Sequence, residues 1–255
     1  MIDWLDITIL GPAFVAGLLV LATHVPLGQE VFKRGIIFID LAIAQLAGLG
    51  VILASQLGFE THGWEVQLIA VGSALLGAWG FSLLEKHHSQ IQEALIGITF
   101  ILAATGSILL LANNPHGGEQ LKELLVGQIL WITWTQLIPL AVITCFILII
   151  WFGFKLNRRM GFYLLFAIAV TSSVQLVGVY LVFASLIVPA LGSRGYVTKK
   201  SLVLAYVIGI LGYGLGLIFS SVLDLPSGAV IVWMLGIIAL FVNFLGKNRN
   251  MNLMT

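Results

Sequence analysis

The feature that most constrains this chain is a series of apolar runs, most of them long enough to cross a lipid bilayer. A membrane-spanning helix needs about 20 consecutive, mostly apolar residues. Eight such runs lie near residues 7–30, 36–54, 68–84, 94–112, 135–152, 161–177, 201–222 and 228–245. Runs of this length predict an all-α membrane protein with about eight transmembrane helices.

The composition supports a membrane protein. Of the 255 residues, 60% are hydrophobic and only 9% are charged, whereas an ordinary soluble domain is about 25% charged. The length suits a single transmembrane domain over residues 1–255. The net charge of +1 gives no reason to expect a nucleic-acid partner. The one cysteine, Cys145, cannot form an intramolecular disulfide and is expected to be a small buried residue.

Lysine and arginine predict how the chain is oriented in the membrane. If the N-terminus is outside, Lys122 is the only one of the 12 Lys and Arg residues on the outer side. The positive-inside rule then makes the opposite side cytoplasmic and places the C-terminus there.

The same rule constrains residues 155–200, because both ends of this stretch are basic while only about one and a half spans separate them. We expect one full helix to about residue 177, a break at Gly178, and a short return segment ending at Pro189. A second short apolar segment, "LLVGQILWIT", occupies residues 124–133. Broken segments at membrane depth often mark transport sites, so the pattern favours a transporter over a simple anchor.

Asp40 is the only carboxylate well inside a predicted span. Burying a charge there costs at least ~2.5–3.5 kcal/mol, so its side chain should face the protein interior or water. One interpretation is that Asp40 lines a path for a cation or a proton. The alternative is that it lies near the cytoplasmic end of its helix and pairs locally, with Lys33 or Arg34 as partner.

Four further polar residues are candidates for the same path or for metal binding. Gln45 and His24 lie inside predicted spans, although each could serve only as a hydrogen-bonding structural residue. His62 and His116 lie in outer loops beside carboxylates and could bind a metal such as zinc. The alternative for both loops is a solvated surface, or an acidic rim on which a soluble partner docks.

Nothing in the chain points to an enzyme. The sequence has no Ser-His-acid arrangement, no HExxH and no P-loop G-x-x-x-x-G-K-[ST]. The basic connection at residues 192–201 either sets the topology or contacts a cytoplasmic protein. Glycines at 212 and 216 lie four apart on one helix face and predict close helix packing.

Five segments, in chain order, resemble the permeases of bacterial ABC importers for zinc and manganese. They are "PLGQEVFKRGIIFIDLAIAQLAGLGV" at 26–51, "EALIGITFILAATGSILLL" at 93–111, "LLVGQIL" at 124–130, "VGVYLVFASLIVPALGSR" at 177–194 and "DLPSGAVIV" at 224–232. The segment at 177–194 matches the strongest signature of this family, a VG, an apolar run and then Pro-Ala.

The resemblance implies a fold similar to that of the vitamin B12 importer's membrane subunit, with short broken segments besides the spans. It implies a homodimer in the bacterial inner membrane, surrounded by lipid. It also implies two partners, a cytoplasmic ATP-binding subunit that hydrolyses ATP and an extracytoplasmic metal-binding protein. This chain would bind no cofactor of its own, and the cargo would be a divalent metal ion, zinc first, with manganese or iron as alternatives.

The resemblance also implies roles for particular residues. Asp40 falls on the family's pathway Asp or one residue before it, and Gln45 stands where the family has His. Gln128 replaces the Asp of another family element. With His24, these three form the predicted transport pathway, although a neutral glutamine is a poor zinc ligand. The predicted contact with the ATPase comprises Pro189, Arg194, Gly195 and Tyr196.

Two other functions stay open on the sequence. The chain could be a stand-alone proton-coupled secondary carrier, with Asp40 as the proton or cation site. It could also be a membrane scaffold that transports nothing and tolerates the loss of Asp40. ATP-independent transport by the purified chain would distinguish the first, and the absence of any flux would distinguish the second.

Overall fold

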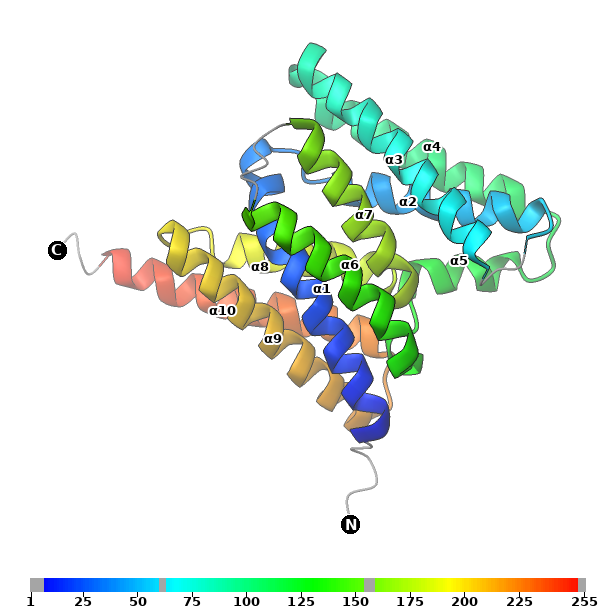
Figure 1. Cartoon of the computed structure of the whole chain (residues 1–255). Helices are drawn as coiled ribbons and strands as arrows, with labels where there is room; N and C mark the ends of the chain where they lie inside the picture. Colours follow the sequence, from blue (N-terminus) through cyan, green and yellow to red (C-terminus); the bar gives the residue numbers. More distant parts are fainter. Residues whose placement is uncertain (1–6, 60–62, 154–158, 252–255) are drawn as a thin grey trace. The chain divides into compact units, whose positions relative to one another are not determined.

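A computed structural model describes residues 7–59, 63–153 and 159–251, and in these ranges every regular element is helical (Figure 1). The α-helices are α1 Ile7–Arg34, α2 Ile39–Gln56, α3 Trp64–His87, α4 Gln92–Leu111, α5 Gly117–Val126, α6 Trp134–Gly153, α7 Arg159–Val177, α8 Val179–Gly192, α9 Thr198–Leu223 and α10 Ser227–Met251. Two short 3₁₀ turns, η1 Ser89–Ile91 and η2 Ile129–Trp131, precede α4 and α6. The all-α prediction is confirmed.

Eight of the described helices are long and apolar enough to cross a membrane. They correspond one to one with the eight predicted spans, whereas α5 and α8 are too short to cross alone. The number of spans could be predicted because the length of an apolar run is a local property of the sequence.

The described chain forms two compact units. Unit 1 comprises the described parts of Met1–Arg34, Gln128–Thr144 and Tyr180–Thr255, and unit 2 comprises those of Gly35–Gly127 and Cys145–Val179. Helix α6 begins in unit 1 and ends in unit 2.

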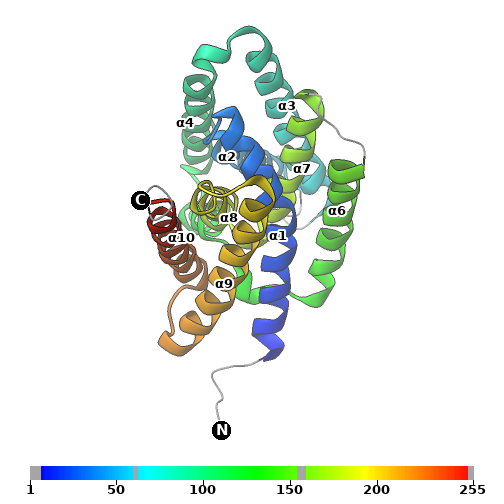
Figure 2. The same ribbon diagram turned by 90° about the vertical axis from the view of Figure 1, so that its left-hand side faces the viewer.

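In unit 1, α9 packs against both α1 and α10 (Figure 2). Glycines allow this close packing. A Cβ on Gly212 would lie closer than 3.0 Å to the Leu235 side chain, and one on Gly216 would meet Ile231 as closely. The predicted role of these two glycines in helix packing is therefore confirmed, and α10 is the helix that approaches.

In unit 2, α2 packs against α3, α4 and α7, and α3 also packs against α7 (Figure 1). A Cβ on Gly50 of α2 would touch Ala70 and Ser73 of α3, and one on Gly77 of α3 would touch Leu46. Residue numbers rise along one helix as they fall along the other, so α2 and α3 are antiparallel. The first turn of α2 therefore lies level with the end of α3.

The break between α7 and α8 lies at Gly178, as predicted, because this residue has φ 83°. The predicted end of the return segment at Pro189 is wrong, since α8 continues to Gly192. Proline at this position only removes one backbone donor. The following turn is held by Ser193, whose hydroxyl donates to the Pro189 carbonyl at 2.8 Å.

Cys145 is exposed on α6, so the expectation that it is buried is wrong. The apolar character of its run does not decide its position. Lipid chains are as apolar as a protein core, so a residue of this kind is equally stable on either side of a membrane helix.

Candidate functional site

Asp40 is fully buried in the first turn of α2, with 0% of its surface exposed. Neither carboxylate oxygen has a hydrogen-bond partner in the described residues. Of the two basic residues considered as local partners, Lys33 Nζ lies 3.9 Å and Arg34 Nε 2.9 Å from Glu30 carboxylate oxygens. Local pairing therefore does not account for Asp40.

The position of Asp40 on its helix partly compensates for its burial. The N-terminal turn of a helix carries a partial positive charge that favours a nearby carboxylate. Such a dipole contributes less than the cost of removing a carboxylate from water. A buried carboxyl group without a partner in the described residues can take up a cation or a proton without breaking an existing hydrogen bond.

Gln45 is also buried, with 7% of its surface exposed. It lies on the same helix as Asp40, five residues and so about 7.5 Å further along the axis. At 100° per residue the two side chains leave α2 on different faces. They lie on one helix but do not form a pair.

His24 is completely buried in α1 of unit 1. Its Nδ1 lies 2.9 Å from the Val20 carbonyl oxygen. Nδ1 also lies 3.1 Å from Thr23 Oγ1. A hydrogen bond to the Val20 carbonyl requires the proton on Nδ1, and in that tautomer Nε2 presents a lone pair. Nε2 has no partner in the described chain. The imidazole is thus in the tautomer that can bind a metal ion.

The remaining predicted ligands are not assembled into a metal site. Gln128 is exposed at the start of η2. His116 is exposed, and its Nδ1 lies 3.4 Å from a Glu119 oxygen. His62 lies outside the described residues. No group of three or more His, Cys, Asp and Glu side chains that could hold a metal ion occurs in the described ranges.

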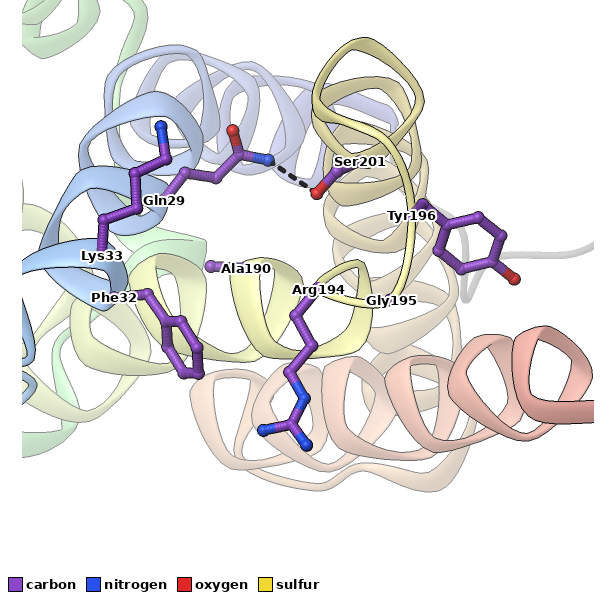
Figure 3. A pocket seen from close by; sticks show the side chains of 8 residues that line it. All are labelled: Gln29, Phe32, Lys33, Ala190, Arg194, Gly195, Tyr196 and Ser201. Atoms are coloured by element: carbon purple, nitrogen blue, oxygen red, sulfur yellow. Dashed lines mark hydrogen bonds between the residues drawn. The ribbon is translucent and has the colours of Figure 1, made fainter. Parts of the chain in front are cut away.

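Three of the four predicted coupling residues, Arg194, Gly195 and Tyr196, line a cavity of about 490 Å³ in unit 1 (Figure 3). The cavity also involves the last turns of α1, through Gln29, Phe32 and Lys33, together with Ala190 and Ser201. The fourth residue, Pro189, is buried in α8 and directly precedes Ala190 in the sequence. The loop after α8 therefore lies against the end of α1.

A series of hydrogen bonds fixes this loop. Gln29 Nε2 donates to Ser201 Oγ at 3.2 Å, and Ser201 Oγ donates to Ser193 Oγ at 3.1 Å. The Tyr196 hydroxyl donates to the Val242 carbonyl of α10 at 3.3 Å. The loop is thereby connected to α1, α9 and α10, so a force on it would reach three helices of unit 1.

Sequence reasoning missed Gln29, Ser193 and Ser201, which hold the loop, and two polar residues of α7, the buried Thr171 and the partly exposed Gln175. The available signal was the same for all five. Each is a polar side chain at the end of an apolar run. A residue in such a place is readily interpreted as the end of a membrane span that faces water.

Several membrane helices, a buried carboxyl group without a partner in the described residues and a loop tied to several helices are features typical of membrane transporters. The family model described as the ABC 3 transport family matches residues 6–158 and 153–246. The chain therefore belongs to the ABC 3 transport family. The resemblance to the permeases of metal ABC importers is confirmed, and the family is one of transport permeases.

Individual relatives match over most of their length. The manganese transport system membrane protein MntC of Halalkalibacterium halodurans is 25% identical over 252 residues, covering 89% of this chain and 84% of that protein. A Thermotoga maritima protein named "Probable metal transport system membrane protein" is 28% identical over 267 residues, covering 95% and 90%. A solved structure, PsaBC from Streptococcus pneumoniae in complex with Fab, matches with TM-score 0.75 and 24% identity over 95% of each chain. The structural likeness shows that the fold is shared.

Proposed function

We propose that this chain is the permease subunit of an ATP-driven importer of a divalent metal ion, with Asp40 as a carboxylate of the transport pathway. The observation that carries this proposal is a completely buried carboxylate, without a partner among the described residues, in a membrane helix of an ABC 3 transport family member. Structural carboxylates in membranes are normally paired. A carboxylate without a permanent partner suits an ion that binds only transiently.

The cargo we place first is manganese, ahead of the zinc expected from the sequence. The buried polar side chains of α2 both carry oxygen ligands, the Asp40 carboxylate and the Gln45 amide. Oxygen ligands suit manganese, whereas imidazole suits zinc, and Gln45 stands where the family has His. A relative named for manganese transport supports the same choice.

In this proposal Asp40 supplies the one negative charge that offsets the loss of water from the passing ion. A pathway must hold its ion weakly enough to release it. A single carboxylate with neutral neighbours meets this requirement better than a closed set of charged ligands. Asp40 would thus lower the barrier without trapping the ion.

The partners follow from the family. The whole chain would act as one permease domain and form a homodimer in a bacterial inner membrane, with its C-terminus in the cytoplasm. A cytoplasmic ATP-binding subunit would contact Arg194, Gly195 and Tyr196, and an extracytoplasmic metal-binding protein would deliver the ion. The hydrogen bonds that tie this loop to α1, α9 and α10 support its use as a coupling element.

The test is to purify the chain from its native membrane in mild detergent, identify every co-purifying protein, and measure Mn²⁺ uptake by the reconstituted complex. We expect a partner with a P-loop and uptake that requires ATP. Uptake that continues without ATP, from a homo-oligomer with no ATPase, would instead establish a secondary carrier. A control ABC importer that keeps its ATPase under the same conditions makes the second result decisive.

A further inference from the structure

Two polar side chains of α7 in unit 2 carry buried atoms that have no hydrogen-bond partner among the described residues. Thr171 is 1% exposed, and its hydroxyl oxygen has no hydrogen-bond partner in the part of the chain that the structure describes. Gln175 is partly exposed, but its amide nitrogen is buried and also has no partner in the described ranges. Residues four apart on a helix lie on the same face, one turn above the other. We refer to Thr171 and Gln175 together as the α7 polar face.

Gln175 is held by a residue of the neighbouring helix. Gln67 of α3 donates an amide N–H to Gln175 Oε1 at 2.5 Å. A pair of amides can exchange roles, since each has a donor and an acceptor. If both groups rotate, Gln175 donates to Gln67 and presents its own oxygen to the buried side. The pair can therefore offer an oxygen ligand and still keep its mutual hydrogen bond.

The contacts within unit 2 place the α7 polar face far from Asp40. Gln67 lies in the first turn of α3, and α3 runs antiparallel to α2, so Gln67 is level with the last turn of α2. Gln175 is bonded to Gln67 and is therefore also level with that turn. Asp40 lies in the first turn of α2, about 22 Å away along the helix axis.

Helices α2 and α7 pack together, so both polar groups belong to the same helix pair. The end that carries the α7 polar face is the one that the positive-inside rule places outside the cell. Burying a polar group without a partner destabilises a protein. Because these atoms have none in the described chain, they are available to a ligand that is present for part of the time.

We propose that the α7 polar face is an outer oxygen-donor site for the transported divalent cation, which the ion occupies before it reaches Asp40. This proposal rests on the proposed function. A hydroxyl and an amide oxygen are neutral ligands that suit manganese and hold a divalent ion loosely. A loose neutral site followed by a charged one gives the ion a favourable direction of travel through unit 2.

The test compares three variants in the reconstituted permease–ATPase complex. Thr171→Val removes the hydroxyl and keeps the shape, and Thr171→Ser retains a hydroxyl. The matched control is Ser107→Ala, because Ser107 is also 1% exposed in unit 2 but its hydroxyl already donates to the Ala103 carbonyl. The readouts are the Mn²⁺ uptake rate at saturating Mn²⁺ and the temperature of thermal unfolding.

A site for the ion predicts opposite effects on the two readouts. Thr171→Val should lower the uptake rate about fivefold, which is the effect expected from the loss of one hydrogen-bonding group. The unfolding temperature of this variant should stay equal or rise. Thr171→Ser should restore the rate, and Ser107→Ala should leave it unchanged. A lower unfolding temperature with an unchanged uptake rate would show that Thr171 is structural and would overturn the site.

The proposed function fails in a different way. If the wild-type complex carries neither Mn²⁺ nor Zn²⁺, the importer and the α7 site are both overturned. If it carries Zn²⁺ alone, the same comparison of uptake rates with Zn²⁺ decides the α7 site. An unchanged rate in Thr171→Val beside normal wild-type uptake overturns the α7 site and leaves the importer standing.

Discussion

Gly127 and Gly178 meet backbone to backbone in unit 2. A Cβ on Gly127 would lie closer than 3.0 Å to the main chain of Val177 and Gly178, and a Cβ on Gly178 would lie as close to Val126 and Gly127. Both glycines have positive φ, 70° and 83°. They follow the ends of α5 and α7, so two breaks in the chain are held together where no side chain fits.

Alanine at either position should therefore be strongly destabilising. Gly127→Ala must adopt φ 70° and ψ 177°, a conformation essentially restricted to glycine, and must also displace the opposing backbone. We expect a loss of about 3 kcal/mol or more, from conformational strain of 1–3 kcal/mol together with steric overlap. Thermal unfolding of the detergent-solubilised chain measures this.

The control is Gly58→Ala, because Gly58 has φ 88° but nothing within 4 Å of its missing Cβ. It should show the cost of the backbone conformation alone. If the unfolding temperature of Gly127→Ala is no lower than that of Gly58→Ala, the close approach of the two breaks is not important for stability.

Asp40→Asn should reduce Mn²⁺ uptake at least about tenfold, because it removes the charge that offsets dehydration of the ion. Since Asp40 has no hydrogen-bond partner in the described chain, the variant should be as stable as the parent or more so. Uptake by the reconstituted complex and the amount of protein in the membrane are the two measurements. Glu119→Gln, on an exposed carboxylate, is the control; equal uptake by both variants would argue against a pathway role.

Gln45→His should shift the selectivity of transport toward zinc. The substitution places an imidazole where the chain has a buried amide, and imidazole is a good zinc ligand. We expect the ratio of Zn²⁺ to Mn²⁺ uptake to rise several-fold, about 1 kcal/mol of discrimination. Competition uptake with both ions measures the ratio. Gln45→Asn should leave the ratio unaltered, and an unchanged ratio in Gln45→His would place Gln45 away from the ion.

Ser201→Ala should loosen the loop that follows α8. It removes the hydroxyl that accepts from Gln29 and donates to Ser193, at a cost of about 1–2 kcal/mol. We expect less metal transported per ATP hydrolysed, since the loop no longer moves with α1. Parallel ATPase and uptake assays give this ratio, with Thr105→Ala on the exposed face of α4 as control. A fall in both activities by the same factor would indicate general damage.

Arg194→Ala should weaken the complex with the ATP-binding subunit and leave the stability of the chain unaltered, because Arg194 is exposed. Co-purification in mild detergent measures the complex, and we expect the bound ATPase to fall severalfold, by about 1–2 kcal/mol of contact energy. Lys199→Ala removes a nearby exposed cation and is the matched control. Equal retention of the ATPase by both variants would exclude Arg194 from the contact.

The helical architecture could be predicted because it depends on local properties. The eight spans follow from run length, and the break at Gly178 follows from a glycine between two basic regions. The exposure of Cys145 and the length of α8 past Pro189 could not be predicted. Inside a membrane an apolar residue is tolerated facing either lipid or protein, and a proline does not have to end a helix whose freed groups find other partners.

The sequence by itself determined that this chain spans a membrane, and that Asp40 is its one carboxylate deep in a predicted span. Only the tertiary structure decided that Asp40 has no partner in the described chain, that Gln29 bonds to Ser201, and that Gln175 bonds to Gln67. The two pairs are separated by 172 and 108 residues. The length of an apolar run and the type of a residue are local properties of the sequence, whereas the hydrogen-bond partner of a side chain depends on which helices pack together.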